Sequence, residues 1–148
     1  MTRLSRRQSG FTLIEIMVVL VIIAILGALI GPQIIGQVGE ARIKATKLDL
    51  RNLSTALDMY QIDNYRYPTT EQGLEALVRK PTVEPFAPNW RPQGYIRDGT
   101  LPKDQWKNPY IYRQPGAEGR PYDLITLGAD AKPGGEGEDA DFSVWTLD

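Results

Sequence analysis

The chain opens with a basic segment followed by a long apolar stretch. From Phe11 to Ile30 almost every position is apolar, and Glu15 carries the only charge. At 1.5 Å per helical residue, about twenty residues span the hydrocarbon core of a bilayer. The pattern therefore predicts a membrane-spanning helix near the N-terminus. An unpaired carboxylate just inside such a helix is costly, so Glu15 needs a functional explanation.

Farther along, apolar residues return at the spacing that forms one face of an α-helix. They follow one another at intervals of 7, 3, 4 and 3 residues: Ile43, Leu50, Leu53, Leu57 and Tyr60. We expect one long helix from about Phe11 to Asp63, with its second half packed on a globular head. Gly31 and Pro32 interrupt this helix, and we expect a hinge there, as a kink or a locally melted turn, because proline removes a backbone donor.

The elements after the long helix are predicted to be short. Thr69 and Gln72 have the spacing of a capping box, ahead of a short helix that contains Leu74 and Leu77. The next segment, residues 81–109, is rich in proline, glycine and polar residues. We expect an irregular loop, which its large apolar side chains attach to the core: Phe86, Trp90, Tyr95, Ile96 and Trp106.

Three β-strand patterns close the chain, at residues 110–112, 122–127 and 142–147. The segment Gly116–Gly119 has the composition of a hairpin connection between the first two strands. The predicted fold class is therefore α+β, with a long N-terminal helix packed on a small antiparallel sheet.

Composition excludes several classes of function. The 148 residues include 17 basic and 18 acidic ones, so the chain carries no electrostatic footprint for nucleic acid. It contains no cysteine and no histidine, which rules out disulfides, Cys-His dyads, Ser-His-Asp triads and histidine-ligated zinc. Nothing in the sequence indicates a catalytic cleft, and we expect a protein that is not an enzyme.

The N-terminal segment resembles the type IV prepilin motif. Arg3, Arg6 and Arg7 precede Gly10, and the motif Gly-Phe-Thr-Leu-Ile-Glu ends at Glu15. The basic residues favour a cytoplasmic leader. The resemblance implies that a membrane prepilin peptidase cuts between Gly10 and Phe11, that Phe11 is then N-methylated, and that Glu15 directs assembly by pairing with the N-terminal amine of a neighbouring subunit. The alternative is an uncleaved signal anchor whose Glu15 only reaches back to the membrane interface.

The chain as a whole resembles the major pseudopilins of type II secretion systems, which have the type IV pilin-like fold. The resemblance rests on four segments: Leu57–Tyr60, Asp63–Leu77, the Asn108-Pro109-Tyr110 turn, and Tyr122–Asp130 with its Leu-Gly-Ala-Asp run. Two positions depart from the family's pattern. Ala131 stands where the family usually has glycine, and Asp141-Phe-Ser-Val-Trp145 replaces the usual Asp-Ile-Gly-Asn-Trp ending.

The loop from Asp130 to Asp141 holds five carboxylates and one lysine. Its residues alone allow two interpretations, a solvated acidic loop or a site for calcium, which prefers six to eight oxygen ligands in a flexible cage. The family resemblance implies calcium, with these ligands: the Leu127 carbonyl, Asp130, Asp139, Asp141 and Ser143. Asp139 and Ser143 follow least directly from it, because the length and ending of the loop vary.

The resemblance also implies the organisation and role of the chain: a leader at 1–10, a transmembrane and filament-core helix at 11–35, and a periplasmic head at 36–148. It implies a bitopic inner-membrane subunit that polymerises into a periplasmic pseudopilus and drives export of folded proteins through the outer membrane. Its partners would be other copies, minor pseudopilins and the inner-membrane assembly platform. Two alternatives remain, a true type IV pilin and a signal-anchored periplasmic enzyme or calcium-binding module.

Overall fold

The computed structural model describes residues 10–147, apart from the side chains of residues 29–35. Its main element is helix α1 (Leu13–Asn64), which agrees with the long helix expected from the apolar spacing. Internal contacts divide the chain into a first unit that ends at Val38 and a second, compact unit that begins at Gly39. The helix continues through Gly31 and Pro32, so the subunit by itself has no melted turn there; one missing backbone donor does not end it.

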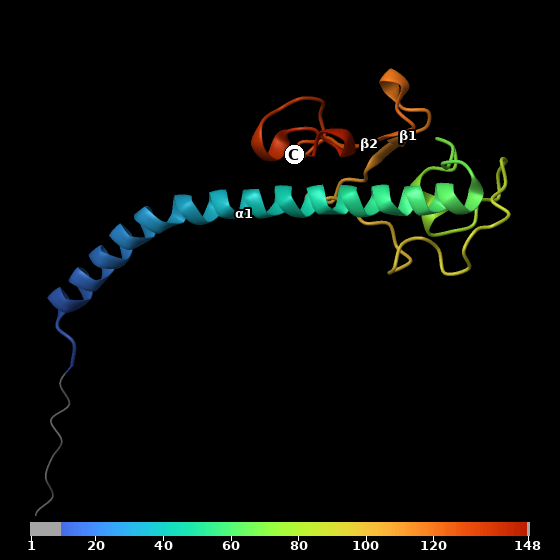
Figure 1. Ribbon diagram of the computed structural model, residues 1–148. Helices are drawn as coiled ribbons and strands as arrows, with labels where there is room; N and C mark the ends of the chain where they lie inside the picture. The colour runs from blue at the N-terminus through green and yellow to red at the C-terminus, as the bar shows by residue number, and fades with distance from the viewer. Residues whose placement is uncertain (1–9, 148) are drawn as a thin grey trace, which may run out of the picture. The chain divides into compact units, whose positions relative to one another are not determined.

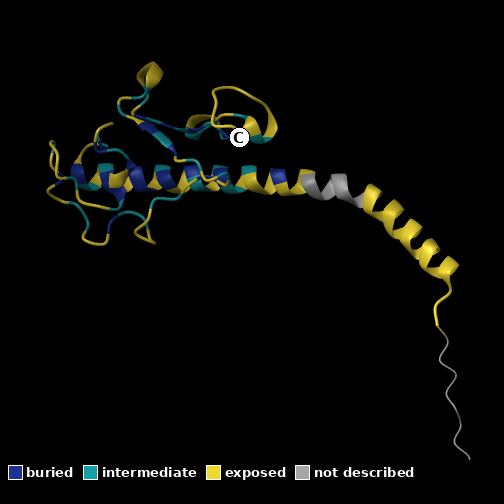
Figure 2. Ribbon diagram, turned by 180° about the vertical axis from the view of Figure 1, so that it is seen from behind, coloured by how far each residue is buried: buried dark blue, intermediate teal, exposed yellow. Residues whose placement is uncertain are grey.

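The second half of α1 carries the core of the compact unit. Leu50, Leu53, Leu57 and Tyr60 are at most 2% exposed, whereas Ile43 is only partly buried. Figure 2 shows buried residues recurring along this half of the helix, with exposed residues between them. One face of the helix is therefore fully used for packing, as the spacing predicts.

A three-stranded antiparallel sheet lies on one side of this half of α1 (Figure 1). The strand order is β1 (Ile111–Arg113), β2 (Asp123–Thr126) and β3 (Phe142–Ser143). Each pair is antiparallel, with Tyr112 opposite Leu124 and Thr126 opposite Phe142.

The sheet contacts the helix through the residues at the start of β2. Tyr122 and Leu124 are at most 1% exposed, and the Tyr122 hydroxyl lies 2.7 Å from the Ser54 hydroxyl on α1. The third strand is shorter than predicted. After Ser143 the chain turns into a 3₁₀ turn, Val144–Thr146, in which the Ser143 hydroxyl accepts the backbone N–H of Trp145.

The predicted capping box is present, but the helix behind it is a single 3₁₀ turn, Leu74–Leu77. The Thr69 hydroxyl accepts the Gln72 N–H at 3.2 Å, and the Gln72 side-chain oxygen accepts the Thr69 N–H at 3.1 Å. The Gln72 amide also donates to the carbonyls of Val83 and Pro85. The glutamine is thus used to join this turn to the following loop, and the chain does not extend into an α-helix.

The loop 81–109 is irregular and is attached to the core by aromatic side chains, as expected. The Trp90 indole donates to the Ala76 carbonyl at 2.7 Å, and Tyr95 packs against the ring of Tyr60 with ring centroids 5.3 Å apart. Phe86 is an exception to the prediction, since it is 54% exposed.

An ion pair fixes the same loop to the end of α1. Arg91 donates from Nη2 to Oδ1 of Asp63 at 3.2 Å and from Nε to the other carboxylate oxygen. The hydrogen bonds from Arg91 lower the pKa of the Asp63 carboxyl below its ordinary value. Asp63 therefore contributes stability that is fully present above the ordinary pKa of 3.8 and is lost as the pH falls through the lowered value.

We predict that Asp63→Asn lowers the melting temperature of the detergent-solubilised protein at neutral pH. The difference from the unsubstituted protein should shrink as the pH falls below 3.8, because the wild-type carboxylate is then protonated as well. Thermal unfolding followed by circular dichroism at several pH values measures this. Asp98→Asn, at an exposed position, is the control and should show no such difference at any pH.

Candidate functional site

The first half of α1 presents apolar side chains on every face. The large apolar residues between Phe11 and Leu26 are each 45–81% exposed. An amphipathic surface helix has one apolar face, whereas a helix that is apolar all round is normally covered. Among the residues that the structure describes, no helix combines the length and hydropathy needed to cross a membrane.

Glu15 closes a capping box at the start of α1. Its backbone N–H donates to the Thr12 hydroxyl at 3.3 Å, and its carboxylate accepts the Thr12 N–H at 3.4 Å. The sequence contains the signature of this capping box, Thr-x-x-Glu, in addition to the prepilin motif that predicts a role in assembly. The carboxylate therefore has a local partner in the isolated subunit. Of the other N-terminal predictions, the leader residues 1–9 lie outside the described part of the chain, as do the side chains of Gly31 and Pro32.

The acidic loop folds back on itself through its glycines. Gly128, Gly134, Gly135 and Gly137 all have positive φ, between 62° and 94°. At Gly128 a Cβ would lie 2.5 Å from the Glu138 carbonyl oxygen, so only glycine lets the two ends of the loop approach this closely. The Ala129 N–H donates to that same carbonyl at 2.8 Å.

Two of the predicted calcium ligands are held by the loop's own backbone. Asp130 accepts the N–H of Lys132, and Asp141 accepts the N–H of Gly134, each at 3.0 Å. Both carboxylates thus bind the same short stretch of backbone, residues 132–134. Because their donors are two residues apart, the loop already draws its first and last carboxylates towards one segment.

The fit of the predicted ligand set to calcium is partial. Leu127, Asp141 and Ser143 line one cavity of about 500 Å³ beside the sheet, whereas Asp130 and Asp139 are not among its lining residues. Within residues 10–147, no group of three or more carboxylates stands close enough to hold a metal ion. Three of the five predicted ligands therefore line the same cavity, together with Arg113 and Arg120, and the other two do not.

A buried carboxylate that the sequence analysis missed fixes the start of this loop. Asp104 is 2% exposed; its Oδ2 accepts the Thr126 hydroxyl at 2.6 Å, and its Oδ1 accepts the N–H groups of Trp106 and Asn108. The Asn108 amide then donates to the Gly128 carbonyl at 2.8 Å. The tight turn around Asn108-Pro109 was a usable signal, but only the fold brings it to the end of β2.

Glu138 was also missed, and it is the one carboxylate of the loop that turns inward. Its Oε2 accepts the Trp106 indole N–H at 2.8 Å and lies 3.3 Å from Nη1 of Arg42 on α1. The hydrogen bond from Trp106, together with Arg42, lowers the pKa of Glu138. Sequence separation hid this contact, because Arg42 and Glu138 are 96 residues apart.

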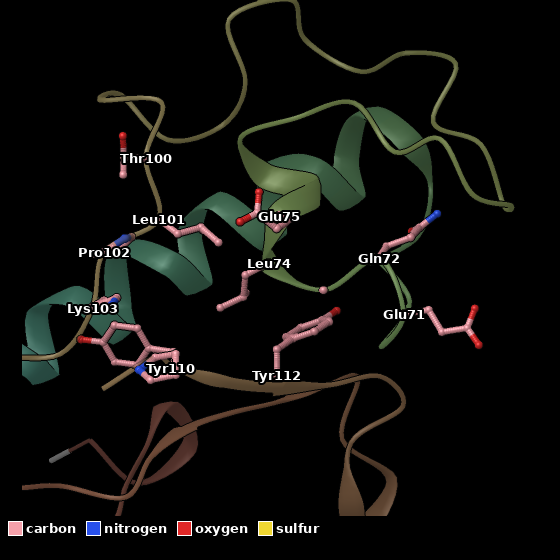
Figure 3. Close-up of a pocket in the computed structure, with 12 residues that line it drawn as sticks. Glu71, Gln72, Leu74, Glu75, Thr100, Leu101, Pro102, Lys103, Tyr110 and Tyr112 are labelled. Atoms are coloured by element: carbon pink, nitrogen blue, oxygen red, sulfur yellow. The ribbon is translucent and has the colours of Figure 1, made fainter. Parts of the chain in front are cut away.

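A shallow groove of about 570 Å³ lies between the turn 71–75, residues 100–103 and the start of β1. Figure 3 shows Leu74, Leu101, Tyr110 and Tyr112 along it. Burial raises the pKa of both tyrosines, so neither phenol is activated as a base. Charged side chains, Glu71, Glu75 and Lys103, line the groove together with these apolar residues.

Two family models cover almost the whole chain. The one described as "Type II secretion system (T2SS), protein G" matches residues 33–145, and the one described as "Prokaryotic N-terminal methylation motif" matches residues 5–31. The chain belongs to the type II secretion system protein G family. The predicted family, and with it the α+β pilin-like fold class, is confirmed.

Individual relatives agree with this assignment. The chain is 53% identical over 140 residues to the type II secretion system core protein G of Pseudomonas aeruginosa, covering 95% of this chain and 96% of the relative. It is 49% identical over 142 residues to that of Vibrio cholerae, covering 96% and 94%. Among solved structures, the major pseudopilin of enterohaemorrhagic Escherichia coli matches with a TM-score of 0.64 and 44% identity, covering 76% of this chain and 93% of that one.

Ala131, where the family resemblance led us to expect glycine, lies at a strained backbone position. Its φ is 55°, in the left-handed region. A side chain there brings Cβ close to the following carbonyl oxygen, at a cost of roughly 1–2 kcal/mol. Ala131 is exposed and is not part of the described hydrophobic core, so no core contact of its side chain offsets this strain.

We predict that Ala131→Gly raises the free energy of unfolding by about 0.5–1 kcal/mol, since the relief of strain exceeds the added freedom of the unfolded chain. Chemical denaturation of the detergent-solubilised protein measures the change. Ala129→Gly is the matched control in the same loop. Ala129 is not among the residues with positive φ, so this substitution should lower stability by up to about 1 kcal/mol.

Proposed function

We propose that this chain is a structural subunit of a type II secretion pseudopilus, which polymerises in the periplasm and drives export of folded proteins through the outer membrane. The proposal rests on the contrast between the two ends of helix α1, one packed against the head and the other apolar and exposed. The second half of α1 packs against the head, whereas the large apolar side chains from Phe11 to Leu26, within an N-terminal methylation motif, are left uncovered. A polymer of such subunits covers the first half by packing helix against helix.

Before assembly, the same apolar surface would be covered by lipid. We propose that residues 11–35 anchor the subunit in the inner membrane, with the leader in the cytoplasm and the head in the periplasm. The prepilin peptidase then cuts between Gly10 and Phe11, and Phe11 is N-methylated. Minor pseudopilins and the inner-membrane assembly platform complete the set of partners. Gly31 and Pro32 act as a hinge when the subunit moves from membrane to filament.

Glu15 would direct assembly through the new N-terminus. Removal of the leader frees the amine of Phe11, and a carboxylate one helical turn along can accept that cation from a neighbouring subunit. In surroundings of low dielectric this attraction is strong, whereas an unpaired carboxylate is costly. Glu15 therefore exchanges its local contact with Thr12 for one between subunits.

We predict that Glu15→Ala is inserted and processed to begin at Phe11 but forms few filaments and secretes poorly. Electron microscopy of cells that overproduce the protein with its assembly machinery, N-terminal sequencing and a secretion assay measure the three properties. Thr12→Ala is the control, because it removes the hydroxyl that accepts the Glu15 N–H and weakens the capping box, but keeps the carboxylate. Normal assembly of Glu15→Ala would show that the carboxylate is not needed, and an equal defect in Thr12→Ala would show that Glu15 acts through the capping box; either result means that the proposed pairing is wrong.

We also propose that calcium orders the acidic loop, through the Leu127 carbonyl, Asp130, Asp139, Asp141 and Ser143. Two features support this: five carboxylates repel one another in a short loop, and Leu127, Asp141 and Ser143 already line one cavity. A bound calcium would supply the charge that balances these carboxylates. The loop must rearrange for Asp130 and Asp139 to join the set, and its three glycines with positive φ provide a backbone able to do so.

We predict that a chelator lowers the melting temperature of the folded protein and that added calcium restores it, because an ion that binds only the folded state stabilises it. Asp141→Ala should abolish this response. Glu136→Ala, at an exposed position of the same loop, is the control and should keep it. A melting temperature that is unaffected by the chelator, with no ion bound, would return the loop to the solvated interpretation.

A further inference from the structure

Glu138 differs from the other four carboxylates of the acidic loop in where it points. Asp130, Glu136, Asp139 and Asp141 are exposed, whereas the Glu138 side chain is 35% exposed and meets α1. Its Oε2 accepts a hydrogen bond from the Trp106 indole and a charged one from Arg42. A salt bridge this exposed contributes little by itself. Glu138 makes further contacts, however, that hold the loop against α1.

Because Gly39 on α1 has no side chain, it leaves room for this carboxylate. A Cβ at Gly39 would lie 2.6 Å from Oε1 of Glu138 and 3.1 Å from its Cδ. Glycine weakens a helix relative to alanine, so a buried glycine inside α1 needs a packing reason. The close approach of Glu138 supplies that reason. Gly36, one turn earlier and exposed, meets nothing within 4 Å of its own Cβ position.

The backbone of Glu138 also holds the start of the loop. Its carbonyl accepts the N–H of Ala129, at the start of the loop, at 2.8 Å. Its partner Trp106 stacks on Phe142, at the end of the loop, with ring planes 9° apart and centroids 6.3 Å apart. Glu138 therefore joins α1, the turn at Trp106 and the start of the acidic loop, and its partner Trp106 contacts the end of the loop.

We propose that Glu138 is a positioning residue: it clamps the acidic loop onto α1 at Gly39 and Arg42, and so orders the loop without a cation. The proposal rests on and deepens the proposed calcium function, since a loop clamped through Glu138 leaves its four other carboxylates exposed and available to an ion. It also attaches the loop to the point on α1 where the compact unit begins.

Hydrogen exchange of the full-length protein in detergent micelles, read by mass spectrometry in the presence of chelator, tests the clamp. In Glu138→Ala the amides of residues 128–141 should exchange at least about tenfold faster, the factor expected from losing a hydrogen bond to a charged group. Gly39→Ala should have a similar effect, although alanine favours the helix. Gly36→Ala is its matched control and should leave the loop unchanged.

The double variant Gly39→Ala/Glu138→Ala distinguishes the clamp from separate effects. If Gly39→Ala acts by displacing Glu138, the double variant exchanges no faster than Glu138→Ala alone, because both remove the same contact. Loop exchange in Gly39→Ala that equals that of Gly36→Ala, or additive effects in the double variant, would overturn the proposal.

A second arm with added calcium separates this proposal from the one it rests on. Slower loop exchange of the wild type with calcium, and a weaker calcium response in Glu138→Ala, supports both. Faster exchange of the clamp variants in chelator, with no effect of calcium on the wild type, supports the clamp and overturns the calcium proposal alone.

Discussion

Leu50, Leu53, Leu57 and Tyr60 form the face of α1 on which the sheet, the 3₁₀ turn and the long loop all depend. The sheet has three strands of two to four residues each, too little to be stable without a surface to pack on. No disulfide or described metal cluster supplements it. Removing water from this helix face is therefore what gives the short, irregular elements their positions.

The N-terminal part of the same helix has an apolar surface that the subunit leaves exposed. The side chains from Phe11 to Leu26 are exposed on all faces, and leaving that much apolar surface in water is unfavourable. The apolar face of α1 is thus buried within the subunit at the C-terminal end of the helix, whereas the apolar residues at its N-terminal end have no partner within the described residues. An assembly that buries the first half supplies the missing contacts, which is the physical basis of the proposed polymer. Glu15 contacts Thr12 in the subunit, and in the proposed polymer it would contact a neighbour's N-terminus instead.

Local contacts reduce the electrostatic repulsion among the five carboxylates of the acidic loop. Backbone N–H groups hold Asp130 and Asp141, while Arg42 and Trp106 take Glu138 out of the cluster. Glycines with positive φ make the reversals possible, and Ala131 accepts strain at a position of the same kind. These contacts lower the repulsion that a cation would otherwise have to balance alone. The order of the loop is consequently separable from the proposed binding of calcium.

The sequence by itself determined the long helix, its buried face, the antiparallel order of the strands and the family. Each of these follows from periodicity or from a contiguous motif, and both are properties of neighbouring residues. It overestimated the short helix near Leu77 and the length of the third strand, where side chains such as Gln72 and Ser143 hydrogen-bond to nearby backbone instead of letting the element continue. Only the tertiary structure decided that Glu138 faces Arg42 and Gly39, and that Asp104 fixes the start of the loop. Those contacts join residues far apart in the chain, and the reason they form is the packing of the sheet against one face of α1.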